Sequence, residues 1–136
     1  MSLLKINTDG GAKGNPGPAS IGGVFYIDNK KIFQFHKKIG FATNNDAEYQ
    51  ALIFALKEIK KQKEKLVKEF NVEKIEFYSD SKLLVNQING FFKVKNSKIK
   101  EYVFKIRILE QEINLPITYH QIPREKNLEA DNLVNY

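Results

Sequence analysis

Segments rich in β-branched and aromatic residues alternate with helical patterns in a definite order along the chain. The segments with a strand pattern are 3–9, 19–28, 30–40, 74–80 and 115–122. The segments with a helical pattern are 45–70, 81–90, 97–113 and 127–136. The order β-β-β-α-β-α-α-β-α combines a hairpin, with the turn-like sequence DNKK, and strand–helix crossovers. It predicts an α/β fold, a mixed five-stranded sheet with helices packed on it.

Length and composition limit the class of protein. The 136 residues are enough for one domain, which we expect to cover 1–136, and 42% are hydrophobic, enough for a core. No apolar run is long enough to span a membrane, and no cysteine is present to form a disulfide or a thiolate metal site. These features predict a cytoplasmic protein. The net charge of +6 suits a polyanionic partner, although it also suits simple solubility.

Two aspartates follow apolar segments in the same way. Asp9 lies in Thr8-Asp9-Gly10, and Asp80 lies in Ser79-Asp80-Ser81. In α/β sheets, ligands bind at strand ends near a change in strand order, so both carboxylates are candidate site residues. The alternative is that each aspartate only caps a turn or the following helix.

Glu48 has an unusual place for a carboxylate. It is in register with an apolar stripe whose other members recur at helical spacing: Leu52, Ala55, Leu56 and Ile59. A buried carboxylate is costly unless a cation or hydrogen-bond donors meet it. Glu48 is therefore a candidate metal ligand, and a solvated end of the stripe is the alternative.

Asp131 is the fourth candidate, three residues after Leu128 in the last predicted helix. Alone it is unremarkable. Together, acids at two strand ends and near two helix starts are placed to converge, and four carboxylates that close would repel one another. Hard divalent cations such as Mg²⁺ relieve such repulsion, so the pattern predicts a magnesium site.

Four separate blocks of sequence resemble ribonuclease H of type 1. They are TDGGAKGNPGPASIGGVF, TNNDAEYQALIFAL, YSDSKLLVNQINGFFKVKN and REKNLEADNLVN, and each carries one of the four acids. The resemblance covers nearly the whole chain and implies a ribonuclease H-like fold. It implies that Asp9, Glu48, Asp80 and Asp131 are catalytic and bind metal, as two Mg²⁺ ions during catalysis, with Mn²⁺ as a substitute.

The activity that the resemblance implies is endoribonucleolytic cleavage of the RNA strand of an RNA–DNA hybrid by a monomer. The products would carry 5′-phosphate and 3′-hydroxyl ends. The implied nucleic-acid contacts are Gly10, Gly11, Asn15, Thr43, Asn44, Asn45, Ser81, Lys93 and Lys95. The glycines would let the backbone approach the hybrid closely, and Asn15 would sense RNA 2′-hydroxyls. A structural loop with packed Phe91 or Phe92 is the alternative for the segment with the two lysines.

The chain departs from the family pattern in two places. It looks too short for the basic, handle-like helix of some members. The loop before Asp131 is the short IPREKN, where many members have a longer loop with a histidine. Arg124 or Glu125 is an auxiliary candidate there, because His120 lies within a predicted strand. His36, in the hairpin, is interpreted as structural or solvated.

Three other interpretations stay open at this point. One is another nuclease of the same fold, although the GNPGPA loop argues against it. Another is a non-catalytic module that binds hybrids, although all four acids are present. The third is a structural cation-binding protein without a nucleic-acid partner.

Overall fold

The computed structural model describes residues 2–135. Its strands are β1 Ser2–Ala12, β2 Gly17–Ile27, β3 Lys30–Ala42, β4 Val72–Ser79 and β5 Ile117–Gln121. Its helices are α1 Asn44–Lys68, α2 Lys82–Ile88, α3 Ser97–Ile113, the short 3₁₀ helix η1 Arg124–Lys126, and α4 Leu128–Val134. The predicted order is confirmed, and η1 is the addition. The last residue of the predicted final helix, 136, lies outside the described residues.

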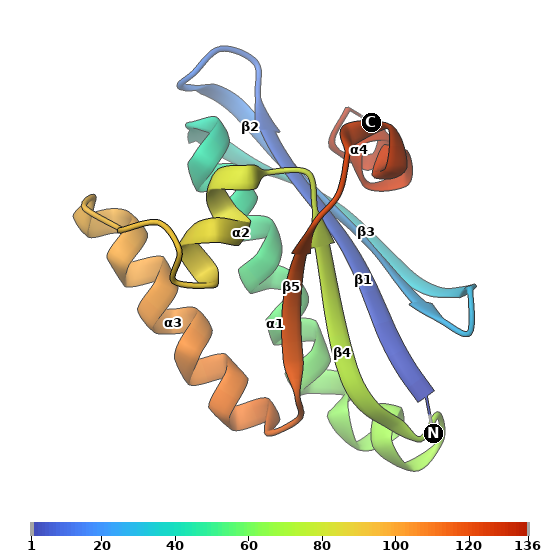
Figure 1. Cartoon of the computed structure of the whole chain (residues 1–136). Coiled ribbons are helices and arrows are strands. Elements are labelled where there is room, and N and C mark those ends of the chain that lie inside the picture. The colour runs from blue at the N-terminus through green and yellow to red at the C-terminus, as the bar shows by residue number, and fades with distance from the viewer. Residues whose placement is uncertain (1, 136) are drawn as a thin grey trace.

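The five strands form one mixed sheet in the order β3-β2-β1-β4-β5. β1 pairs antiparallel with β2 and parallel with β4, and β4 pairs parallel with β5. β1 is therefore the central strand, between an antiparallel half and a parallel half (Figure 1). Because β1 and β4 run the same way, the residues that follow them meet at one edge of the sheet.

The hairpin between β2 and β3 has the predicted turn. Ile27 pairs with Lys30, which leaves Asp28 and Asn29 as a two-residue connection. Their φ angles are 51° and 63°, in the left-handed region that two-residue hairpin turns require and that Asp and Asn tolerate. The turn fixes the register of the β2–β3 pair.

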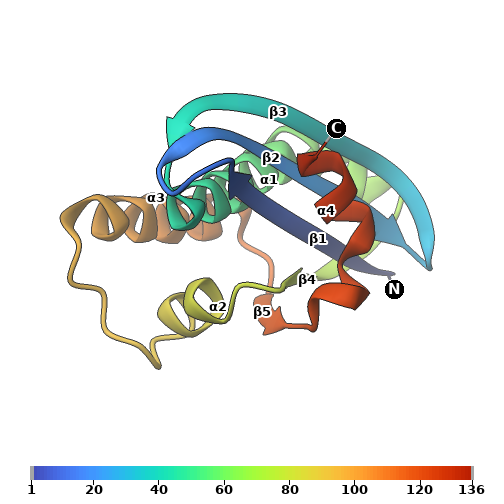
Figure 2. The same ribbon diagram turned by 90° about the horizontal axis from the view of Figure 1, so that it is seen from above.

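The helices cover the two faces of the sheet unequally. Figure 1 shows α1, α2 and α3 on one side and α4 alone on the other, and the view from above in Figure 2 agrees. The core lies between the sheet and the larger helical layer, where residues such as Leu4, Ile6, Leu52, Leu56 and Ile106 are almost fully buried. This packing places the start of α1 beside the end of β1.

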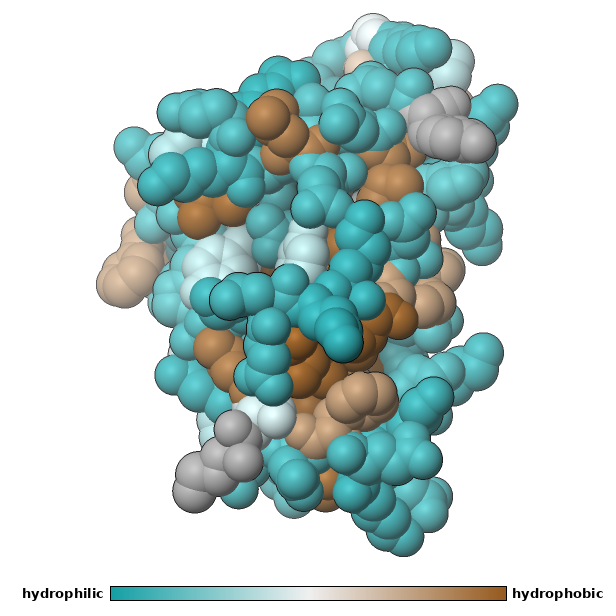
Figure 3. Space-filling model, turned by 90° about the vertical axis from the view of Figure 1, so that its right-hand side faces the viewer, coloured by the Kyte–Doolittle hydropathy of each residue, from teal (hydrophilic) through white to brown (hydrophobic). Residues whose placement is uncertain are grey.

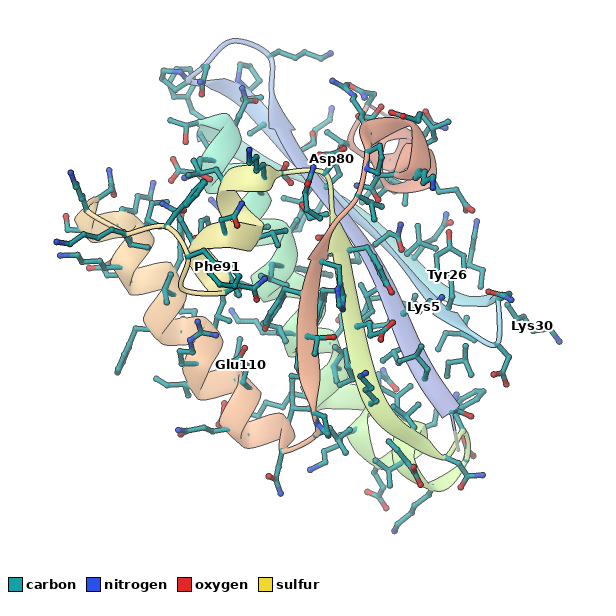
Figure 4. All side chains as sticks on the ribbon, in the orientation of Figure 1. Lys5, Tyr26, Lys30, Asp80, Phe91 and Glu110 are labelled. Carbon is teal, nitrogen blue, oxygen red and sulfur yellow. The ribbon has the colours of Figure 1, made fainter. Side chains whose placement is uncertain are left out.

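The side of the sheet that carries α4 is less covered. Figure 3 views the molecule from that side and shows a mostly hydrophilic surface with smaller hydrophobic areas. Lys5 and Tyr26 project from the sheet on this side (Figure 4). Within residues 2–135, no helix has the length and apolar character needed to cross a membrane.

Candidate active site

Three carboxylates meet at the edge of the sheet where β1 and β4 end. Asp9 lies within β1, which continues to Ala12, three residues beyond the strand end that the sequence predicted, because residues 10–12 still pair with β2. Glu48 lies in the second turn of α1, and Asp80 follows β4 directly. One ligand oxygen from each lies within 4.8 Å of the other two. They line a cleft of about 370 Å³, and Figure 4 shows Asp80 at its position between β4 and α2. The predicted convergence of these three acids is therefore present in the structure.

The backbone of Gly10 holds two of the acids together. Its N–H donates to Oδ1 of Asp9 at 3.0 Å and to Oε1 of Glu48 at 2.9 Å. A Cβ atom on Gly10 would lie 2.3 Å from the carbonyl carbon and oxygen of Ala47. The glycine is thus required by the contact between β1 and α1. The close approach of the hybrid to this glycine stays a prediction.

Glu48 is buried because of where α1 begins. Thr43 is the N-cap, and its hydroxyl accepts from the N–H of Asp46, whose carboxylate in turn accepts from the N–H of Thr43. This capping box starts the helix so that Glu48 points at the end of β1. Only 8% of Glu48 is exposed, so its predicted place at the top of the apolar stripe is confirmed, and the solvated alternative is wrong.

The surroundings of the acids favour bound protons or a bound cation. Burial raises the pKa of Asp9 to about 8, and the charges of Asp80 and Asp131 and a hydrogen bond with Asp131 add to the effect. Burial, with the charges of Asp9 and Asp80, also raises the pKa of Glu48 well above its usual range. The pKa of Asp80 is raised by burial, against a hydrogen bond from Asn127 and the charge of Arg124. Three oxygen ligands that resist ionisation together fit a hard divalent cation.

Asp131 lines the same cleft but has a different partner. Its Oδ1 accepts from Nη2 of Arg124 at 3.3 Å. It does not belong to the group of three oxygens within 4.8 Å of one another. The predicted convergence of four carboxylates is therefore close for Asp9, Glu48 and Asp80. Asp131 lies in the same cleft and hydrogen-bonds to Asp9, outside that group of three. Arg124, an auxiliary candidate, reaches the cleft from η1, whereas the exposed Glu125 is not among its lining residues.

Asn127 is a site residue that the sequence analysis missed. It is 1% exposed. Its Oδ1 accepts from the side chain of Asn7 at 3.1 Å, and its Nδ2 donates to the carbonyl of Thr8 at 3.0 Å. It also hydrogen-bonds to Asp80. Asn127 thus fixes the start of α4 against β1. The available signal was its spacing of one helical turn before Asp131.

The loop between β1 and β2 is tied to the start of α1. The backbone N–H of Asn44 donates to Oδ1 of Asn15 at 2.9 Å, and Oδ1 of Asn44 accepts from the N–H of Ala12 at 2.8 Å. Asn44, Gly10 and Gly11 line the cleft. The side-chain oxygen of Asn45 is buried without a hydrogen-bond partner among residues 2–135. Asn15 is therefore joined to the start of α1, where Thr43, Asn44 and Asn45 are consecutive, and of these four predicted contacts Asn44 lines the cleft.

Three other predicted contacts lie outside the cleft. Ser81 is the N-cap of α2, and its Oγ accepts from the N–H of Leu84 at 3.1 Å. Because Ser81 caps this helix, Asp80 is free to face the cleft, and the alternative that Asp80 is the cap is wrong. Lys93 and Lys95 are exposed in the segment between α2 and α3, and neither lines the cleft.

The phenylalanines of the same segment are not packed inside. Phe91 is 76% exposed and Phe92 42% exposed, and Figure 4 shows Phe91 on the connection after α2. The structural alternative for this segment is therefore wrong for Phe91. His120 lies in β5, as predicted, where it stacks on Tyr78 at 5.1 Å and hydrogen-bonds to Thr118 at 2.8 Å.

The fold and the acidic cleft define a nuclease-like domain, and the comparisons with known proteins identify the family. A family model described as reverse transcriptase-like matches residues 7–136. A ribonuclease H of Acetivibrio thermocellus is 32% identical, and the match covers 94% of this chain and 77% of that protein. LC11-RNase H1, isolated from compost, is 43% identical with a TM-score of 0.90, over 99% of this chain and 94% of that one. The chain belongs to the ribonuclease H type 1 family.

One of these neighbours was solved with nucleic acid. LC11-RNase H1 in complex with an RNA/DNA hybrid is 42% identical, has a TM-score of 0.89, and is matched over 97% of this chain and 94% of that one. Other relatives are longer than this chain. A bifunctional protein of Mycobacterium tuberculosis is 36% identical over 96% of this chain, and the chain spans about a third of its length, 34%.

Proposed function

We propose that the protein is a metal-dependent endoribonuclease that cuts the RNA strand of RNA–DNA hybrids. The observation that carries this proposal is the cluster of Asp9, Glu48 and Asp80, whose ligand oxygens lie within 4.8 Å of one another in an open cleft. Family membership supports it, and so does the neighbour solved with a hybrid. We also infer that the protein is a cytoplasmic monomer and that this chain folds as one catalytic domain.

Asp9, Glu48, Asp80 and Asp131 would hold the metal. When bound, two Mg²⁺ ions would supply an activated water and neutralise charge on the leaving 3′-oxygen, and Mn²⁺ is a possible substitute. The chain itself positions the acids, through the N–H of Gly10 for Asp9 and Glu48, and through Asn127 for Asp80. Products with 5′-phosphate and 3′-hydroxyl ends belong to the same proposal.

Recognition of the hybrid would use the residues that surround the acids. Gly10, Gly11 and Asn44 line the side of the cleft next to the β1–β2 loop. Asn15 accepts a hydrogen bond from the N–H of Asn44 there, and RNA 2′-hydroxyls would be sensed at this place. Thr43 and Asn45, at the start of α1, would lie near a phosphate of the DNA strand, since helix N-termini favour phosphate. Lys93 and Lys95, with Ser81, would contact the DNA backbone outside the cleft. Arg124, paired with Asp131, is the auxiliary residue that we favour over Glu125.

Cleavage of matched end-labelled substrates tests the proposal. The substrates are an RNA–DNA hybrid, a DNA duplex, an RNA duplex and each single strand, with Mg²⁺, Mn²⁺ or chelator. We expect the RNA strand of the hybrid to be cut with metal and its DNA strand to stay intact. Equal cutting of both strands would indicate another nuclease of this fold. Binding of the hybrid without cleavage would indicate a non-catalytic binding module. Metal binding without salt-dependent binding of the hybrid would indicate a structural cation site.

A further inference from the structure

A second concave surface lies outside the catalytic cleft, between β3, α1 and α3. Its volume is about 440 Å³. We call it the lysine groove and define it by four cationic and two aromatic side chains: Lys37, Lys57, Lys98, Lys105, Phe54 and Tyr102. Among the residues that the structure describes, no carboxylate lines it. The groove is therefore a concave surface of one charge sign, which attracts a polyanion.

Most of this positive charge is not compensated by the protein. All four lysines are exposed. Lys98 pairs with Asp46 at 3.5 Å, whereas Lys37, Lys57 and Lys105 take part in none of the salt bridges formed within residues 2–135. Three cations from three different elements are thus directed at one groove without an acidic partner. Phosphate groups of a ligand would supply the missing charge.

The floor of the groove has aromatic rings that are held from behind. Tyr102 stacks on Tyr49 at 5.6 Å, and its hydroxyl accepts from Nε2 of Gln50 at 3.3 Å. Phe54 packs against Phe35 at 4.5 Å, and Nζ of Lys37 lies 5.8 Å from the centre of its ring. Both rings are half-buried. Fixed aromatic surfaces beside cations are typical of sites for single strands, whose bases are free to stack, whereas a duplex hides its base faces.

The groove adjoins the proposed path of the DNA strand. Lys98 contacts Asp46, and Asp46 forms the capping box with Thr43, the residue proposed to lie near a DNA phosphate. We propose that the lysine groove binds single-stranded DNA that continues from the DNA strand of the hybrid. The continuation rests on the proposed function, whereas binding of single-stranded DNA by the groove is a property that can be measured alone.

Binding of tailed and blunt hybrids tests this proposal. The substrates are a blunt hybrid, the same hybrid with a single-stranded DNA tail at either end, the same hybrid with RNA tails, and oligo(dT) alone. Anisotropy in chelator measures the affinity without cleavage. The variant is Lys37→Ala/Lys57→Ala/Lys105→Ala, which leaves Lys98 and its partner in place. The control is Lys30→Ala/Lys61→Ala/Lys63→Ala, which removes the same charge from β3 and α1 outside the groove.

We expect one of the DNA tails to tighten binding by about tenfold in the wild type. The slope of the logarithm of the binding constant against the logarithm of the salt concentration should also become steeper, by about 0.7 for each phosphate contacted. The groove variant should lose both effects and bind oligo(dT) more weakly, while the control variant keeps them. Circular dichroism melts establish that both variants fold. An equal loss in the two variants, or a gain from RNA tails alone, would overturn the proposal. A protein that binds oligo(dT) through the groove and never cuts a hybrid would overturn only the proposed function.

Discussion

Asp9 has a different affinity for protons in the folded and unfolded chain. The ordinary pKa of an aspartate is 3.8, and burial with the nearby acids raises that of Asp9 to about 8. Between these values the folded, metal-free protein binds a proton that the unfolded chain has lost. Its free energy of unfolding therefore falls as the pH rises from about 4 to about 8. Glu48, whose pKa is also raised, acts in the same direction.

This linkage predicts a pH dependence of stability that Asp9→Asn removes in part. In chelator, the wild type should melt at a higher temperature at pH 5 than at pH 8, and Asp9→Asn should show a smaller difference. Thermal melts at pH 5, 6.5 and 8 measure it, with Glu73→Gln on the exposed surface of β4 as the control. The change in melting temperature from pH 5 to pH 8 in chelator is compared between the wild type and Asp9→Asn. A change that is more positive in the wild type would contradict the raised pKa of Asp9.

Asp80→Asn should separate catalysis from folding. Asn keeps the shape of the side chain but loses its charge, so one of the proposed metal ligands is lost. We expect kcat to fall by at least about a hundredfold, roughly 2.7 kcal/mol at about 1.36 kcal/mol per decade. In chelator the variant should melt above the wild type, because one of several mutually repelling acids is gone. Excess Mg²⁺ should narrow that gap, since metal stabilises the wild type more.

An activity assay beside paired melts checks this prediction. Near-normal turnover in Asp80→Asn would show that the acidic cluster is not the catalytic site. An inactive variant that melts below the wild type in chelator would show that Asp80 also has a structural role. Glu73→Gln, which removes an acid from β4, the strand before Asp80, at a position away from the cleft, should leave both activity and melting temperature unchanged.

At the scale of elements, the contact between β1 and α1 decides the geometry of the cleft. Gly10→Ala would place a Cβ 2.3 Å from backbone atoms of Ala47, which no side-chain movement relieves. We expect a loss of stability of about 1–3 kcal/mol or more. Gly11→Ala is the matched control, because its Cβ would lie 3.5 Å from a side-chain carbon of Val134. Urea denaturation measures the free energy of unfolding of both variants. Equal values would mean that the backbone of α1 does not pack closely against Gly10.

The elements themselves were largely predictable from the sequence. The strand and helix patterns and the turn-like sequence that begins at Asp28 are local signals, and they correspond to observed elements. The burial of Glu48 followed from helical spacing. The role of Asn127 did not, because its partners Asn7 and Thr8 lie at the other end of the chain. The need for a glycine at position 10 could not be predicted either, because it depends on how closely α1 approaches β1.

At the scale of the whole molecule, charge is distributed unevenly. The chain has 22 basic and 16 acidic residues, and four of those acids line one cleft. The rest of the surface is correspondingly more basic, so affinity for a hybrid should fall as the salt concentration rises. Lys93→Ala/Lys95→Ala should reduce the slope of the logarithm of hybrid affinity against the logarithm of salt concentration by about 1–2. The same variant should raise KM more than it lowers kcat.

Hybrid affinity at several salt concentrations measures this slope. The control is Lys30→Ala/Lys61→Ala, which removes two exposed lysines that lie away from the segment after α2; Figure 4 shows Lys30 at the tip of the β2–β3 hairpin. An unchanged slope in the first variant would mean that the segment 91–96 does not contact the hybrid. An equal reduction in both would mean that only the total charge matters.

The strand order brings together in one cleft acids that lie far apart along the chain. Asp9 lies on the central strand β1, whereas Asp80 follows β4 and Asp131 lies in α4, far along the chain from Asp9. Asn127 joins the last of these elements to the first. The four acids therefore come together only when β4 and α4 have both packed beside β1 and α1.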